Sequence, residues 1–407
     1  NETPCQILRY REVKTKKQTH YEIVLDRTPF YAEMGGQVGD SGVLRSENET
    51  IRILNTIKEN NLTIHISNQL PQTPEADFTA QFDKERRQRI ANNHSATHLM
   101  HAALRQVIGA HVEQKGSLVD DERLRFDFSN FEPVTALQLQ EVERLVNEQI
   151  LMTKPVEIAQ MEIDKAKKLG AMALFGEKYG DVVRVVSVPD FSIELCGGSH
   201  VKNIGEIGMF KIVSETGIAS GVRRIEALTG KAAIDYMNEK AETLAAAAHA
   251  FKCRDDELVS HIESALAENK KLKQEIASFT KERAMGDVDT LLAQKKQIKD
   301  LSFASGIVEA DNIDDLRKIA DMLLDRLESG VVVLAAAHEG KVSIVAKASD
   351  AAVAKGAHAG NIVKAAAKIV GGGGGGRKEM AQAGGKEPAK MPEALQEAER
   401  VLAEQLA

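Results

Sequence analysis

The segment His94-Ser-Ala-Thr-His98 decides how the first half of this chain must fold, because it sets two imidazoles four residues apart. It lies within a helix predicted from about Lys84 to Val107, where residues four apart share a face, and His101 continues the same stripe. A second segment, Cys196-Gly-Gly-Ser-His200, supplies a thiol and a third imidazole. The two segments are far apart in the sequence, so a common metal site requires a fold that joins them.

Together the two segments offer three histidines and one cysteine, a donor set that suits tetrahedral Zn²⁺. The predicted ligands are His94, His98, Cys196 and His200. The two glycines are expected to let the backbone turn tightly between Cys196 and His200. Ser95 stands where a His-Glu-x-x-His metalloprotease helix carries its general base, which disfavours an unrelated zinc hydrolase. Four protein ligands are typical of a structural site, so the sequence leaves open whether zinc activates water or only positions a substrate.

Composition limits the classes of protein to consider. A chain of 407 residues that is 43% hydrophobic predicts two or three domains. The net charge of −7 restricts any nucleic-acid surface to a local patch. The apolar runs are too short to cross a membrane, no secretory signal is visible, and three dispersed cysteines favour a reducing, cytoplasmic location. The chain begins with Asn1 rather than methionine, as a fragment of a longer protein would.

The order of the predicted elements favours a multidomain α+β protein. Residues 1–84 are expected to be β-rich, with a glycine-rich loop at 30–42 that needs positive φ in a turn. Residues 85–228 mix helices and strands without a regular βαβ alternation. The metal segments fall in this second region.

The stretch from about Lys231 to Lys296 predicts a long helix, because glycine is rare and Ala, Glu, Lys and Leu dominate. A spacing of alternately four and three residues runs from Leu244 to Phe279, with Asp255 and Asn269 as polar exceptions. This pattern predicts a coiled-coil-like stalk that needs a partner helix. An ordinary amphipathic helix packed on a globular core is the alternative.

Residues 301–407 predict a small α/β domain with a local positive patch. Basic residues outnumber acidic ones between 341 and 390, although the whole chain is acidic. The candidate RNA-binding residues are Lys364, Lys368, Arg377, Lys378 and Lys386, with solvated surface lysines as the alternative. The glycine run at 371–376 is expected to be a linker, or to let the backbone approach RNA closely. It lacks the Gly-Lys-Ser/Thr that would indicate a nucleotide-binding loop.

Taken together, these motifs resemble the carboxy-terminal half of alanyl-tRNA synthetases. The resemblance includes Tyr31-Ala-Glu-Met-Gly-Gly-Gln-Val-Gly-Asp40, both metal segments, Arg123-Leu-Arg-Phe-Asp127, Gly221-Val-Arg-Arg-Ile-Glu-Ala227 and the tail through Gly384-Gly-Lys386. It runs in order over essentially the whole chain. Freestanding editing proteins share the metal segments, but the stalk and the glycine-rich tail favour the synthetase. The aminoacylation core of the family is absent from this sequence, so we expect no alanine activation.

The resemblance implies an editing domain at 1–228, a helical stalk at 229–300 and a domain for tRNA binding and dimerisation at 301–407. It implies hydrolysis of mischarged Ser-tRNA(Ala) and Gly-tRNA(Ala), with Zn²⁺ on the four ligands and Cys196 at the reaction centre. Thr97 and Gln114 match pocket positions linked to editing. Their alternatives are a helix threonine bonded to its own backbone and a surface amide. Ser199 replaces the usual threonine and keeps its hydroxyl. A non-catalytic module that binds tRNA, dimerises and holds a structural zinc is the competing hypothesis.

Overall fold

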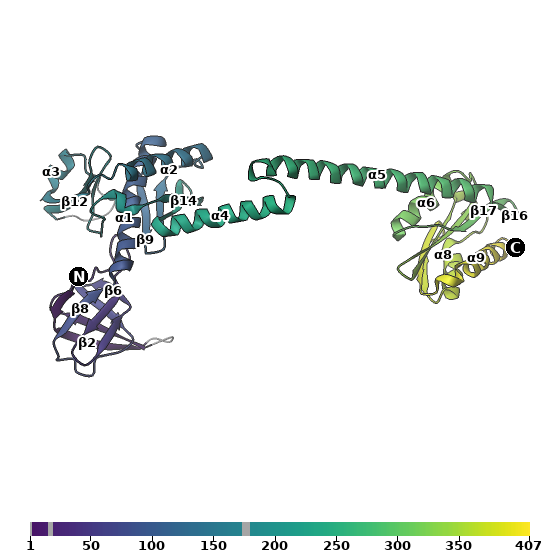
Figure 1. The fold of residues 1–407 in the computed structure, drawn as a ribbon. Coiled ribbons are helices and arrows are strands. Elements are labelled where there is room, and N and C mark those ends of the chain that lie inside the picture. The colour runs from purple at the N-terminus through teal and green to yellow at the C-terminus, as the bar shows by residue number, and fades with distance from the viewer. Residues whose placement is uncertain (1, 15–18, 173–179) are drawn as a thin grey trace. The chain divides into compact units, whose positions relative to one another are not determined.

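The computed structural model describes residues 2–14, 19–172 and 180–407. The chain divides into two compact units, residues 1–250 and 251–407 (Figure 1). Each contains both sheets and helices, which confirms a multidomain α+β protein. The expected domain boundaries at 228 and 300 stay predictions. Among the described residues, no helix combines the length and apolarity needed to cross a membrane.

The first part of unit one is β-rich, as expected. Two antiparallel four-stranded sheets have the orders β1-β8-β4-β5 and β2-β3-β7-β6. Alternating apolar residues such as Ile23, Leu44 and Ile53 form its buried core. The strands are β1 (Glu2–Cys5), β2 (Ile7–Lys14), β3 (Thr19–Leu25), β4 (Gly42–Arg45), β5 (Thr50–Ile53), β6 (Asn55–Glu59), β7 (Leu62–Ser67) and β8 (Phe78–Phe82).

Helix α1 (Lys84–Val107) leads out of the β-rich part and packs against the sheet β14-β15-β10-β9. Asp83 caps the helix by accepting a hydrogen bond from the Arg86 amide. Leu99 and Phe126 are buried together at the centre of this core. The four strands are β9 (Gln114–Val119), β10 (Leu124–Ser129), β14 (Phe210–Ala219) and β15 (Val222–Thr229). Helix α2 (Ala136–Leu151) packs on the same core.

A three-stranded sheet, β11-β12-β13, carries the second metal segment at the end of its last strand. Its strands are β11 (Glu157–Glu162), β12 (Val182–Val188) and β13 (Ser192–Leu195), with α3 (Ile163–Lys168) after β11 and the short turn η1 (Ile204–Ile207) after the metal segment. Cys196 directly follows β13, so the position of this strand determines where the thiol lies.

The expectation of one continuous helix from about Lys231 to Lys296 is wrong. Helix α4 (Gly230–Phe251) ends where Lys252 adopts φ 54°, and the short turn η2 (Asp255–Glu257) precedes α5 (Leu258–Ala293). The 4-3 spacing therefore crosses a break and cannot form one continuous seam. Several heptad residues of α5 remain exposed, including Ile276 at 64% and Phe279 at 69%.

Unit two is built on a six-stranded sheet of order β16-β17-β18-β19-β21-β20. Alternate residues of β18 face opposite layers: Val331 and Val333 pack under α8 and α9, while Val332 and Leu334 pack under α6 and the end of α5. The strands are β16 (Lys296–Ile298), β17 (Leu301–Ile307), β18 (Gly330–His338), β19 (Lys341–Ala348), β20 (Gly373–Gly376) and β21 (Met380–Gly385). The helices are α6 (Ile313–Asp325), α7 (Asp350–Ala354), α8 (Ala359–Ile369), α9 (Met391–Gln405) and the turn η3 (Pro388–Lys390).

The glycine run is not a linker, because Gly373–Gly376 form the edge strand β20, paired antiparallel with β21. A Cβ at Gly374 would lie 2.3 Å from the Gln382 carbonyl oxygen, whereas one at Gly373 would meet nothing within 4 Å. Alternate positions of the strand thus approach their neighbour so closely that a side chain cannot fit. This packing explains glycine at the crowded positions without requiring a flexible segment.

Candidate metal centre

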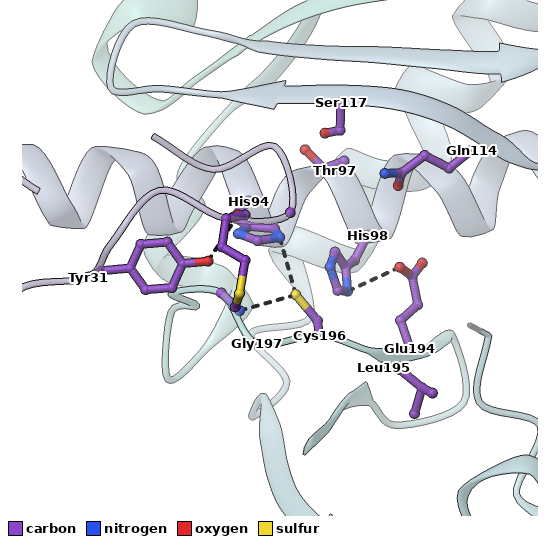
Figure 2. A pocket seen from close by; sticks show the side chains of 13 residues that line it. Tyr31, His94, Thr97, His98, Gln114, Ser117, Glu194, Leu195, Cys196 and Gly197 are labelled. Carbon is purple, nitrogen blue, oxygen red and sulfur yellow. Dashed lines mark hydrogen bonds and ion pairs between the residues drawn. The ribbon is translucent and has the colours of Figure 1, made fainter. Parts of the chain in front are cut away.

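The structure brings the two distant metal segments together. The ligand atoms of His94, His98, Cys196 and His200 all lie within 4.8 Å of one another. The Cys196 Sγ atom is 3.3 Å from Nε2 of His94 and 3.3 Å from Nε2 of His200. Figure 2 shows the imidazoles of His94 and His98, both from α1, beside the thiol that follows β13. The predicted convergence of the two segments is confirmed.

Each imidazole turns its Nδ1 atom outward to a polar group. His94 Nδ1 lies 2.8 Å from Gln37 Oε1, and His200 Nδ1 lies 3.1 Å from Ser95 Oγ. His98 Nδ1 lies 3.6 Å from a carboxylate oxygen of Glu194, which is close enough for an ion pair but too far for a hydrogen bond. The Gln37 oxygen can only accept, so it selects the His94 tautomer that leaves Nε2 available to an ion. The donor set and its surroundings fit Zn²⁺, and Ser95 contacts a candidate ligand.

Glu194 connects the centre to a fourth histidine. Its side chain is buried, and its Oε1 atom lies 3.0 Å from Nδ1 of His101. Thus His101, which the sequence places on the ligand stripe, faces the carboxylate and does not join the four clustered ligands. The ring of His101 also contacts Phe126 at a centroid distance of 5.1 Å.

The chain bends at Gly198, but neither Gly197 nor Gly198 is among the described glycines with positive φ. Backbone conformation therefore does not by itself require glycine here, and at Gly198 close packing does. A Cβ at Gly198 would lie 2.1 Å from Cε1 of His94, whereas one at Gly197 would approach the Met34 side chain at 3.2 Å. The Arg184 guanidinium fixes the same segment by donating to the carbonyls of Cys196 and Gly198.

Electrostatics favours a thiolate in the centre. Burial opposes ionisation, but the charges of His94 and His98 hold the pKa of Cys196 far below its usual range. Burial also lowers the pKa of His98, but Glu194 and Cys196 together raise it to about 9. Burial and the charge of His94 lower the pKa of His200 to about 3. Zinc binds a thiolate and neutral imidazoles, so Cys196 and His200 are already in the required protonation states, whereas His98 would release a proton when an ion binds.

A cavity of about 270 Å³ opens beside the ligands. Its wall includes Tyr31, Thr97, Gln114 and Ser117 in addition to the metal segments (Figure 2). Thr97 Oγ1 donates to the backbone oxygen of Asn93 at 2.8 Å, which is the backbone bond considered as an alternative for this residue. Because the hydroxyl proton is committed to this carbonyl, the oxygen can act toward the cavity only as an acceptor.

Gln37 is a site residue that sequence reasoning did not single out. It lies in the glycine-rich loop between Phe30 and β4 and is completely buried. Gly35 and Gly36 turn this loop with φ of 62° and 84°, as predicted. The sequence feature that could have identified Gln37 is its place as an amide side chain within a glycine-rich loop.

The candidate RNA-binding residues are all exposed and lie on neighbouring elements of unit two. Lys364 and Lys368 belong to α8, which packs beside β20. The amides of Ala359 and Gly360, at the start of α8, donate to the carbonyls of Lys378 and Arg377. Lys386 follows β21, and its amide donates to the Val370 carbonyl just after α8. These hydrogen bonds make the segments that carry the five exposed cations neighbours of α8.

Three family models match the chain. They are described as tRNA synthetases class II (A) over residues 5–86, the second additional domain of threonyl- and alanyl-tRNA synthetases over residues 183–226, and the DHHA1 domain over residues 302–404. The second model covers the segment that contains Cys196 and His200.

Relatives match nearly the full chain. The alanine–tRNA ligase of Acetivibrio thermocellus is 47% identical over 97% of this chain and 45% of its own length. That of Geobacillus kaustophilus is 46% identical over 94% of this chain and 43% of its own length. A crystal structure of the C-Ala domain of Aquifex aeolicus alanyl-tRNA synthetase is 34% identical, with a TM-score of 0.25, over 28% of this chain and 96% of that one. The chain therefore spans less than half the length of the curated relatives it matches.

Proposed function

Because the chain belongs to the alanyl-tRNA synthetase family, we propose that its first unit is an editing esterase that acts on tRNA(Ala) wrongly charged with serine or glycine. The supporting observation is the convergence of four metal ligands beside a cavity that also contains Thr97 and Gln114. A pocket made for alanine rejects glycine and serine weakly, because they differ by one methyl or one hydroxyl. A second, hydrolytic pocket would remove those errors.

Thr97 gives the cavity a way to recognise serine. Its hydroxyl proton is donated to Asn93 O, so a lone pair of Oγ1 can accept from the serine hydroxyl. Alanine offers no such donor. Gln114 lines the same cavity and can both donate and accept, which suits the ester or the terminal ribose.

His94, His98, Cys196 and His200 would hold Zn²⁺, which when bound supplies either a more acidic water or a fixed point for the substrate. Gln37 and Ser95 lie within hydrogen-bond distance of His94 and His200, and Glu194 lies at ion-pair distance from His98. These contacts would orient the ligands beside the reacting ester. The thiolate of Cys196 adds negative charge next to the site and lowers the net charge of the ion that it would bind.

The assay is release of serine and glycine from separately mischarged tRNA(Ala). Cys196→Ala and His94→Ala should slow both reactions, while His249→Ala, at an exposed histidine of α4, should not. Thr97→Val should slow serine release about tenfold and leave glycine release nearly unchanged, because only serine loses a hydrogen bond. Wild-type rates in both metal-ligand variants would show that the metal centre takes no part in the reaction.

We propose that unit two binds the tRNA through Lys364, Lys368, Arg377, Lys378 and Lys386. Exposed cations beside a glycine edge strand can contact phosphates without steric hindrance. Lys364→Glu/Lys368→Glu should weaken tRNA binding and reduce its salt dependence, whereas Lys270→Glu on α5 should have a smaller effect. Equal effects of the two changes would contradict a localised surface.

We also propose a cytoplasmic homodimer joined through unit two, with α5 as part of the contact. Exposed apolar side chains on α5, such as Leu272, Ile276 and Phe279, are the supporting feature. Sedimentation should give a dimer at micromolar concentration, and Ile276→Glu/Phe279→Glu should shift it to the monomer. A monomeric wild-type chain would contradict this part of the proposal.

The closed set of four protein ligands favours one competing function, a non-catalytic tRNA-binding and dimerising module with structural zinc. Metal removal would then lower the melting temperature, but the metal-loaded chain would release no serine. Serine release by the loaded chain decides in favour of the esterase.

A further inference from the structure

The glycine-rich loop of unit one places a buried amide, that of Gln37, against a ligand of the metal centre. We propose that Gln37 is a positioning residue that fixes the His94 imidazole for metal binding and joins it to the Cys196–His200 segment. This inference rests on the metal site of the proposed function. It assigns that site a component outside the two metal segments and their helix.

Both polar atoms of the Gln37 carboxamide, the oxygen and the nitrogen, have partners. Its Oε1 atom lies 2.8 Å from His94 Nδ1 and also accepts from the Ser199 amide at 2.8 Å. Its Nε2 atom donates to Ser199 Oγ at 3.2 Å. One carboxamide thus links a ligand from α1 to the residue next to His200. Since Oε1 can only accept, His94 must carry its proton on Nδ1, which leaves Nε2 free to bind an ion.

The backbone on both sides of Gln37 is held firmly. The Val38 amide donates to the Val119 carbonyl on β9, and the Val119 amide donates to the Gly36 carbonyl. A Cβ at Gly36 would lie 2.6 Å from the Ser117 carbonyl oxygen, so the loop and β9 touch closely.

A second anchor lies at Asp40. Its carboxylate accepts from the Tyr31 amide and pairs with Arg87 of α1, while its carbonyl accepts from Thr56 Oγ1 on β6. The loop is therefore attached to the β-rich part, to β9 and to α1. Anchors on both sides leave the amide of Gln37 little freedom, which is the condition for orienting a ligand without touching the substrate.

Alternative roles for Gln37 fit less well. It does not line the cavity, so direct contact with the ester is not indicated. A purely structural role predicts that any apolar residue of similar size would serve. The Oε1 atom of Gln37, however, contacts both His94 and the Ser199 amide. The positioning role therefore predicts that metal affinity depends on this acceptor oxygen.

The experiment compares Gln37→Leu, Gln37→Glu and Val38→Ala in the full chain, with Co²⁺ as the probe ion. Gln37→Leu removes the acceptor at similar size and should weaken Co²⁺ binding about 10- to 100-fold and alter the Co²⁺ absorption spectrum. Gln37→Glu keeps an oxygen acceptor for His94 and Ser199 and should restore affinity to within a few-fold. Val38→Ala perturbs the same loop and should leave Co²⁺ affinity unchanged even where it lowers the melting temperature.

Wild-type affinity and spectrum in Gln37→Leu would overturn the inference. So would equal losses in all three variants, because the effect would then come from the loop and not from the acceptor oxygen. Serine release is measured in parallel. A wild-type chain that binds Co²⁺ but releases no serine would defeat the proposed function while leaving the Co²⁺ comparison, and the positioning role, intact.

Discussion

His65 should make the first unit sensitive to mild acid. The imidazole is completely buried between the sheets of the β-rich part. Its Nε2 atom lies 2.8 Å from Thr28 Oγ1, its Nδ1 atom lies 3.1 Å from the Ile23 carbonyl oxygen, and its ring contacts Phe30 edge-on. Burial lowers the pKa of His65 from 6.5 to about 4, although the bond to Ile23 opposes the shift.

The direction in which stability changes with pH follows from proton linkage. The folded state has the lower pKa, so the unfolded chain takes up a proton first as the pH falls. Stability is therefore complete above pH 6.5 and is lost as the pH falls toward the folded-state pKa of about 4. With these two pKa values, His65 alone costs about 2 kcal/mol at pH 5 and about 3 kcal/mol at pH 4.

The measurement is the free energy of urea unfolding, followed by circular dichroism at several pH values between 8 and 5. His65→Asn removes the titrating group, so its unfolding free energy should fall about 2 kcal/mol less over this range than that of the wild type. Its absolute stability is lower throughout, because the contact with Phe30 is lost. Parallel pH dependences, or a His65 resonance that titrates near its usual pKa in NMR spectra, would refute the reasoning.

Three further predictions concern particular atoms. Gly374→Ala should destabilise unit two by more than about 2 kcal/mol in chemical unfolding, because its Cβ would meet the Gln382 carbonyl. Gly373→Ala should be nearly neutral, and equal effects of the two changes would contradict the packing. Gly198→Ala should displace the His94 ring and abolish tight Co²⁺ binding, which titration would detect. In the metal-free chain, iodoacetamide should label Cys196 before Cys5, because burial raises the pKa of Cys5 to about 11; mass spectrometry showing Cys5 first would oppose this.

Local patterns predicted the elements that carry the site. A helix was predicted from about Lys84 to Val107 on the periodicity of its side chains, and α1 spans these residues. The four candidate ligands followed from side-chain chemistry and spacing, and the structure brings them together; their binding of a metal stays a prediction. The partners of those ligands did not, because Gln37 and Glu194 reach the imidazoles through tertiary packing that no short motif encodes.

The two main errors have one physical origin. The heptad spacing through residues 244–279 measures the positions of apolar side chains, but it does not detect one residue of left-handed backbone at Lys252 that ends α4. The glycine run likewise shows that side chains are absent without saying why. Glycine is favoured both in a strand packed closely on β21 and in a flexible linker. Only the position of the neighbouring backbone distinguishes these two explanations.

The same reasoning separates the two glycines of Cys196-Gly-Gly-Ser-His200. The sequence alone gives no reason to expect different roles for the two glycines. A Cβ at Gly198 would overlap the His94 ring, whereas one at Gly197 would touch the flexible end of Met34. Glycine at the second position is thus a condition for the His94 imidazole to occupy its place beside Cys196. The two segments are therefore coupled through packing as well as through the ion that they are proposed to share, so the site should keep most of its geometry without an ion.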